Sequence, residues 1–288
     1  MRKISNRIFS FIIYGFAFVT VLLLAFVIYF IVHEALPVFE TVGVKDFLLG
    51  QRWMPLDSSA NPSYGIFNFT AATVYVSVIA VLLAVIISVG TALYLSCAAS
   101  ERTRGFLYSF IDLLAAIPSV VYGFIGLVVL VKLFLRSGHP SGSSVLTAAI
   151  VLAVMILPFL ISSISDTMLK IKEEYQPASS ALGIAEWHMA AEIILPLSLK
   201  SIFLNMILAV SRAMGETMAV MMVMGNANLF PRLLGKSETI ASLIALEMGT
   251  ASAGSTHYHA LYAAGLVLMV LLLIINLTIT AIHKKISP

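Results

Sequence analysis

The chain has 288 residues, of which 60% are hydrophobic and 11% are charged. Soluble domains contain about 25% charged residues, so this composition excludes a soluble globular protein and indicates an integral membrane protein surrounded by lipid. The formal net charge of +3 is too small to indicate a nucleic-acid partner.

Six apolar segments are long enough to cross about 30 Å of hydrocarbon as helices, which rise about 1.5 Å per residue. They lack the alternation of barrel strands, and helices satisfy their backbone amides internally. The sequence therefore predicts an all-α polytopic membrane protein with one transmembrane domain over residues 1–288. The predicted spans cover residues 8–32, 69–95, 107–131, 145–165, 198–223 and 260–282.

Three basic residues, Arg2, Lys3 and Arg7, precede the first span. The segment resembles a secretory signal, but its apolar run is too long and lacks a small-residue cleavage site, so we expect it to remain as a span. With the N-terminus in the cytoplasm, most Lys and Arg residues fall on the inner side. Both termini are therefore predicted to be cytoplasmic.

The first external segment, residues 33–68, is interrupted by Pro and Gly and carries Trp53 and Tyr64. These aromatic residues suit a membrane interface, and we expect the segment to lie against the outer face. In the third span, Pro118 removes an amide donor and clashes with the preceding turn. This predicts either a kink packed on neighbouring helices or a broken helix that lines a water-filled path.

Cys97 is the only cysteine, which excludes an intrachain disulfide and a cysteine metal cluster. We expect it to be a small buried thiol near the inner end of the second span. Asp112 lies near the inner end of the third span, where structural pairing is the expected role.

The longest inner polar segment is residues 166–197. Apolar residues recur there at helical spacing, at Ala178, Ala181, Leu182, Ala185 and Met189. The spacing predicts a short amphipathic helix with Pro177 in its first turn. Such a helix is too short to span and too apolar to remain bare, so it either lies in the lipid interface or docks on a partner. Gly183 admits a close backbone approach or a sharp turn.

Arg212 and Glu216 are charged residues within the fifth span, and Arg212 falls close to the bilayer midplane. Each costs about 2.5 to 3.5 kcal/mol if it faces lipid, so both are expected to face protein or water. One interpretation is a structural i, i+4 ion pair. The other is that Arg212 lines the route of an anion and exchanges between Glu216 and substrate oxygens, because guanidinium groups bind oxyanions in bidentate fashion.

Two outer motifs resemble ligand sites only weakly. Gly235-Lys236-Ser237 is similar to the end of a phosphate loop, but Phe230 stands where the first glycine is needed. His257 and His259 lack a third metal ligand nearby. No nucleophile, base and oxyanion arrangement is evident, so we expect no enzyme activity, no metal and no bound cofactor on this chain.

The inner segment resembles the cytoplasmic loop of ABC importer permeases. That family has Glu-Ala-Ala, three residues, Gly, nine residues and Ile-x-Leu-Pro; here Pro177-Ala178-Ser179, Gly183 and Ile193-x-Leu195-Pro196 keep the spacing. Three further stretches resemble the PstC-type permease of phosphate-specific importers. They are Trp53-x-Pro55 with Tyr64-Gly65-Ile66, then 117–123, then Gly215-Glu216-Thr217-Met218-Ala219-Val220 with Gly225-Asn226.

The resemblance implies a type I permease of the bacterial inner membrane that imports inorganic phosphate. Its implied partners are a homologous PstA-like permease, two PstB-like cytoplasmic ATPases that bind the ATP, and an external PstS-like phosphate-binding protein. The 173–196 loop is then the coupling segment, with Ala178, Ser179, Leu182 and Gly183 at the ATPase contact, and Arg212 and Glu216 lie on the phosphate route. Pro177 departs from the family's Glu and cannot make the contact that the Glu makes.

Other functions remain open on the residues alone. The chain is compatible with a permease for another oxyanion, or with a stand-alone secondary anion carrier. The carrier is disfavoured by the lack of an internal repeat and by the few carboxylates in the membrane. An intramembrane enzyme is a more distant alternative.

Overall fold

The computed structural model describes residues 2–55, 62–138 and 141–286. Its first half contains α1 (Arg2–Thr41), α2 (Val44–Leu49), β1 (Trp53–Met54), β2 (Ser63–Tyr64), α3 (Phe67–Leu93), the π-helical turn η1 (Tyr94–Ala98), α4 (Glu101–Ala116), α5 (Ser119–Ile125), the π-helical η2 (Gly126–Val131) and α6 (Lys132–Arg136). The second half contains α7 (Val145–Ala181), α8 (Glu186–Met189), the π-helical η3 (Ala190–Ile194), α9 (Leu195–Met214), α10 (Met218–Val223), α11 (Ile240–Glu247) and α12 (Thr256–Ile286).

The expected all-α membrane fold is confirmed. In the described part of the chain, six segments are long and apolar enough to cross a membrane: Phe9–Thr41, Phe67–Ala98, Ser119–Arg136, Val145–Ala181, Glu186–Met214 and Thr256–Thr278. Several extend beyond the predicted bounds, because the helices continue into the polar segments on either side.

The centre of the fold is a bundle of α3, α7 and α9. In the main core, α3 contributes Ala72, Ala80 and Ala84, while α7 contributes Ala148 and Ala149, all fully buried. Small side chains let helix backbones approach closely, which compensates for the weak hydrophobic drive between helices in lipid. This bundle supports the segments that carry the candidate sites.

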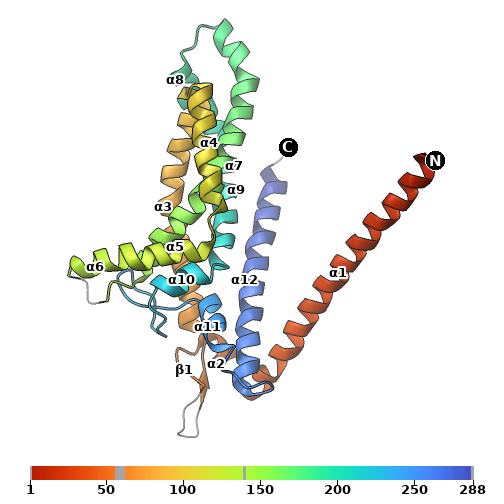
Figure 1. Cartoon of the computed structure of the whole chain (residues 1–288), viewed down its shortest axis with the longest axis vertical. Coiled ribbons are helices and arrows are strands. Elements are labelled where there is room, and N and C mark those ends of the chain that lie inside the picture. Colours follow the sequence, from red (N-terminus) through yellow and green to blue (C-terminus); the bar gives the residue numbers. More distant parts are fainter. Residues whose placement is uncertain (1, 56–61, 139–140, 287–288) are drawn as a thin grey trace.

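The first helix, α1, packs on α12 at its outer end and diverges from the bundle toward its N-terminus (Figure 1). Ala35 and Val38 are buried at the contact, whereas Phe11 and Phe16 on the diverging part are 80% and 72% exposed. An apolar helix with this exposure needs lipid or another membrane helix around it.

The predicted third span, 107–131, is not one helix. α4 ends at Ala116, Ile117 and Pro118 are extended, and α5, η2 and α6 then run across the direction of α3 and α7 (Figure 1). The helix is therefore broken and not merely kinked, and the water-filled path of that alternative stays a prediction. At the break, the Leu114 carbonyl accepts a 2.8 Å hydrogen bond from the Tyr122 hydroxyl and a 3.2 Å hydrogen bond from the Ile117 N–H.

Glycines bring the crossing segment close to its neighbours. A Cβ added at Gly123 would lie 2.8 Å from the Ala219 Cα, and one at Gly126 would lie 2.5 Å from a methyl group of Val151. The lack of a side chain at these two glycines therefore permits the close approach of the crossing segment to α10 and α7.

The outer segments form a separate small core around the hairpin of β1 and β2, in which Trp53 pairs with Tyr64. Trp53 and Tyr64 are 7% and 6% exposed, so they are packed inside this cap and their predicted membrane-interface position is wrong. The reason is a distant partner: Trp53 Nε1 donates a 2.8 Å hydrogen bond to Glu247 Oε2 at the end of α11. The segment does lie against the outer end of the bundle, as expected.

The two ends of the molecule are distinct. The start of α1, the end of α12 and α8 all lie in the upper half of Figure 1, whereas the β-hairpin and α11 lie at the opposite end. The chain therefore brings its inner loop and its terminal helices to the same side of the bundle.

Candidate functional site: an interrupted helix and an exposed inner loop

The predicted fifth span, 198–223, is interrupted in the structure. α9 ends at Met214, and α10 begins at Met218 after Gly215, Glu216 and Thr217. Glycine is a poor helix former, which weakens the helix at this point although the apolar run continues. The interruption places backbone without regular helical bonding beside two charged residues.

Arg212 occupies the last turn of α9 and is exposed on the isolated chain. A cation at a helix C-terminus is favoured by the helix dipole. The Arg212 Cζ lies 5.7 Å from the ring centroid of Phe159 on α7, within the range of a cation–π interaction. An aromatic ring therefore contacts the guanidinium at the helix break.

Glu216 is half-buried, and its Oε1 accepts a 3.2 Å hydrogen bond from the Ala219 backbone N–H in the first turn of α10. Among the described residues, the ion pairs within 4.0 Å all join histidines to glutamates, and none joins Arg212 to Glu216. The structural i, i+4 pair is therefore not formed, because the helix that would align the two side chains ends between them.

A row of polar contacts between α7 and α9 leads toward Arg212. Ser163 donates a 2.7 Å hydrogen bond to Asn205 Oδ1, and the hydroxyls of Thr167 and Ser201 lie 2.9 Å apart. α7 and α9 are antiparallel, so the Ser163–Asn205 contact lies one turn closer to Arg212 than the Thr167–Ser201 contact. Neither Asn205 nor Phe159 belongs to a recognisable sequence motif, although Asn205 stands two helical turns before Arg212.

The methionines near the break differ in exposure. Met214 and Met224 are fully buried, whereas Met218 is 47% exposed and Met221 and Met222 are half-buried. They surround the interruption with flexible apolar side chains that can repack.

At the inner end, α7 continues without a break to Ala181, so Pro177 lies inside a long helix and not in the first turn of a short one. Good helix formers such as Glu173 and Glu174 carry α7 out of the apolar span. Pro177 is exposed, so the carbonyl that loses its helical partner can bond to water.

The predicted coupling residues lie around the turn that follows α7. Leu182 is 76% exposed, Ala178 and Gly183 are also exposed, and Ser179 is 5% exposed. Gly183 has φ +69°, and a Cβ added there would meet nothing within 4 Å. The structure therefore brings three of the four residues to an open surface and turns Ser179 inward.

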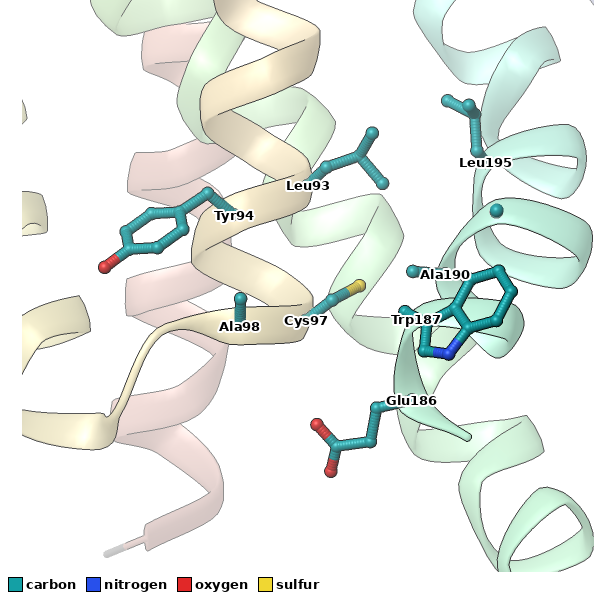
Figure 2. Close-up of a pocket in the computed structure, with 9 residues that line it drawn as sticks. Leu93, Tyr94, Cys97, Ala98, Glu186, Trp187, Ala190 and Leu195 are labelled. Atoms are coloured by element: carbon teal, nitrogen blue, oxygen red, sulfur yellow. The ribbon is translucent and has the colours of Figure 1, made fainter. Parts of the chain in front are cut away.

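A cavity of about 610 Å³ lies beside this turn, between the end of α3 with η1 and the segment from α8 to α9. Figure 2 shows Cys97 pointing from one wall toward Ala190 and Trp187 on the other. Cys97 is half-buried, so the prediction of a fully buried thiol is wrong. Trp187 is 72% exposed, so an apolar surface faces outward at this end.

The two outer motifs, Gly235-Lys236-Ser237 and the histidines His257 and His259, make contacts within the described part of the protein and do not form ligand sites there. Ser237 is buried and pairs with Gly225 in an isolated bridge, outside any phosphate-loop geometry. His257 Nε2 contacts Glu247 Oε2 at 2.8 Å, and His259 Nδ1 contacts the Glu34 carbonyl at 2.8 Å. Within the described residues, no group of three His, Cys, Asp or Glu side chains is placed to hold a metal.

Asp112 does not have its expected partner. It lies exposed on α4, and the ion pairs and hydrogen bonds found in residues 2–55, 62–138 and 141–286 do not include its side chain. Its position leaves the carboxylate free to meet water or another chain.

A bundle of apolar helices, a span interrupted beside two charged residues, and an exposed loop after α7 are features of a membrane transport permease. The chain belongs to the family of binding-protein-dependent transport system inner membrane components, whose model matches residues 88–288. It is thus the permease of an ABC importer.

Curated relatives and solved structures agree with this assignment. The probable ABC transporter permease protein YqgH of Bacillus subtilis is 34% identical over 85% of this chain and 79% of its own. The phosphate transport system permease protein PstC of Pasteurella multocida is 35% identical over 94% of this chain and 90% of its own. The predicted resemblance to PstC-type permeases is confirmed.

A solved structure shows the same fold at low identity. A chain of the MetNI methionine ABC transporter, in an inward-facing conformation, matches 75% of this chain and 94% of its own length, with a TM-score of 0.59 and 14% identity. This similarity supports the type I permease architecture.

Proposed function

We propose that this chain is the PstC-like permease subunit of an ATP-driven importer of inorganic phosphate. The observation that carries the proposal is the exposed Arg212 at the interrupted fifth span, in a chain whose relatives include PstC permeases. A guanidinium is the side chain best suited to bind a tetrahedral oxyanion through paired N–H donors.

The geometry supports a transient phosphate contact at Arg212. None of the hydrogen bonds and ion pairs found in the described residues uses the guanidinium of Arg212, so its donors are available to an anion. Glu216 stands four residues further on and is turned toward α10. An anion at Arg212 would therefore not have to displace a carboxylate first.

Coupling to ATP would occur through residues 173–196. Ala178, Leu182 and Gly183 present an open surface at the end of α7, and Ser179 supports the turn from inside. In this proposal two PstB-like ATPases contact that surface and bind the ATP, and this chain holds no cofactor. In this proposal both termini are cytoplasmic, which agrees with the start of α1 and the end of α12 lying on the same side as α8 (Figure 1).

Two other partners complete the proposed transporter. A homologous PstA-like permease would cover the exposed faces of α9 and the crossing helices, and an external PstS-like protein would deliver phosphate to the outer cap. A permease for another oxyanion is the alternative within the same class, and a stand-alone carrier is the alternative outside it.

The test is uptake of labelled phosphate by cells that contain the complete transporter with Arg212→Gln or wild-type Arg212. We expect the variant to insert and assemble but to lose uptake. Unlabelled phosphate and sulfate are added as competitors, and stronger inhibition by sulfate than by phosphate would identify another oxyanion as the preferred substrate. Normal uptake by Arg212→Gln would exclude Arg212 from the route.

A further inference from the structure

Phe159 is the aromatic residue that contacts Arg212, and no sequence motif pointed to it. The charged carbon of the guanidinium lies 5.7 Å from the ring centroid. A cation over an aromatic face is attracted by the ring quadrupole, and the attraction increases where water is excluded.

The ring is held in place by its own helix. Phe159 is half-buried and packs against the main hydrophobic core, and it follows Pro158, which is buried inside α7. The ring therefore offers Arg212 a fixed surface, whereas a long arginine side chain on its own samples many rotamers.

The register between α7 and α9 brings the two residues within reach of each other, because Phe159 lies opposite position 209 and Arg212 lies almost one turn further along α9. The contacts of Ser163 with Asn205 and of Thr167 with Ser201 join the helices one and two turns inward of Phe159. Because the helices are antiparallel, the next position outward on α7 is Phe159, and the outer end of α9 carries Arg212.

A ring face holds the guanidinium without using its hydrogen-bond donors. A carboxylate partner would occupy those donors and would have to be displaced by an incoming anion. Here the nearest candidate, Glu216, accepts a hydrogen bond from Ala219 instead. The arrangement leaves Arg212 both fixed in place and open to an oxyanion.

We propose that Phe159 is a positioning residue for oxyanion transfer: its ring holds the Arg212 guanidinium at the helix break with the N–H donors free. This inference rests on the proposed function, because it assumes that Arg212 contacts the transported anion. It adds an aromatic residue on a different helix to the transport route.

The experiment replaces Phe159 with phenylalanine bearing one, two or three ring fluorines in the complete transporter. Fluorine withdraws electrons from the ring face while nearly preserving its shape, so it weakens a cation–π contact stepwise. We expect the logarithm of the maximal phosphate uptake rate to fall with each fluorine, by about three- to tenfold over the series. The phosphate concentration for half-maximal uptake should not change, because the external binding protein sets it.

Phe203 provides the matched control. It lies on α9, the helix of Arg212, and is 50% exposed, away from the guanidinium contact. The same fluorination series at position 203 should leave the uptake rate unchanged. A flat series at position 159, or equal slopes at positions 159 and 203, would overturn the proposal.

A pair of ordinary substitutions separates this inference from the proposed function. Phe159→Trp keeps an aromatic face and should retain most of the uptake, whereas Phe159→Leu should lose as much as the trifluorinated ring. If Arg212→Gln abolishes uptake while the Phe159 variants all behave alike, only the positioning role fails. If Arg212→Gln transports normally, the phosphate route itself fails.

Discussion

Ser163 on α7 donates a 2.7 Å hydrogen bond to the side-chain carbonyl of Asn205 on α9. Asn205 is 7% exposed, and its amide nitrogen donates to the Ser201 backbone carbonyl at 2.9 Å. This pair fixes one helix of the bundle against another close to Arg212. The local geometry of the proposed route therefore depends on a polar contact between two spans.

The Ser163–Asn205 pair should behave as a coupled unit. We expect Asn205→Ala to reduce the free energy of unfolding by about 1 to 2 kcal/mol, because Ser163 then loses its buried acceptor. The double variant Ser163→Ala with Asn205→Ala should be less destabilised than the sum of the two single changes, by about 0.6 kcal/mol. Thermal unfolding in detergent measures all three, and strictly additive effects would contradict the coupling.

The Glu216 side chain accepts a hydrogen bond at the start of α10 and also carries a negative charge. Two substitutions distinguish the contributions of the hydrogen bond and of the charge. Glu216→Gln keeps a carbonyl oxygen that can accept from the Ala219 N–H, so we expect normal folding with loss of phosphate uptake. Glu216→Ala should also lower the unfolding free energy by about 1 kcal/mol through loss of the cap. Full uptake by Glu216→Gln would show that capping is the whole role of this residue.

The backbone conformation at position 183 favours glycine, because φ is +69°. A side chain added there would meet no neighbouring atom within 4 Å, so within this chain any effect of a substitution comes from the backbone. Gly183→Val places a β-branched residue in the left-handed region, and we expect it to lose ATPase association while membrane insertion persists. Gly183→Asn is the matched control, because asparagine tolerates this region. Co-purification with the ATPase subunit measures both, and release by Gly183→Asn as complete as by Gly183→Val would show that lack of a side chain, not the turn, is what matters.

Glu238, in the outer cap, should make the free energy of unfolding depend on pH. Burial, together with the nearby Glu247 carboxylate, raises the pKa of Glu238 from 4.5 to about 7. The folded state thus binds a proton more tightly than the unfolded state, and this residue's contribution to stability decreases as pH rises from about 4.5 to about 7.

Removing the charge should remove that dependence. We expect Glu238→Gln to raise the unfolding free energy at pH 8 by at most about 3 kcal/mol and to have little effect at pH 4. Thermal unfolding at the two pH values checks this, with wild type as the reference. An equal change at both pH values would contradict the buried carboxylate as the cause.

The sequence predicted the spans well because lipid requires long apolar runs, and these can be read without knowing their neighbours. It located the breakpoint at Pro118 but not the crossing direction of α5, which depends on Gly123 meeting Ala219. The break at Gly215 was missed because the apolar run from 198 to 223 continues through it.

The candidate site was only partly predictable. Charge in an apolar span identifies Arg212 and Glu216 without a structure, whereas Phe159 is one apolar residue among many in α7 until the register with α9 is known. The burial of Trp53 likewise depends on Glu247, a partner 194 positions away in the sequence.

The central claim is that this permease moves phosphate only when a separate ATPase acts on its inner loop. The most direct measurement is accumulation of labelled phosphate in liposomes that contain either the chain alone or the complete transporter, with and without ATP. The account predicts accumulation only with the complete transporter and ATP. Sustained accumulation by the chain alone would contradict it.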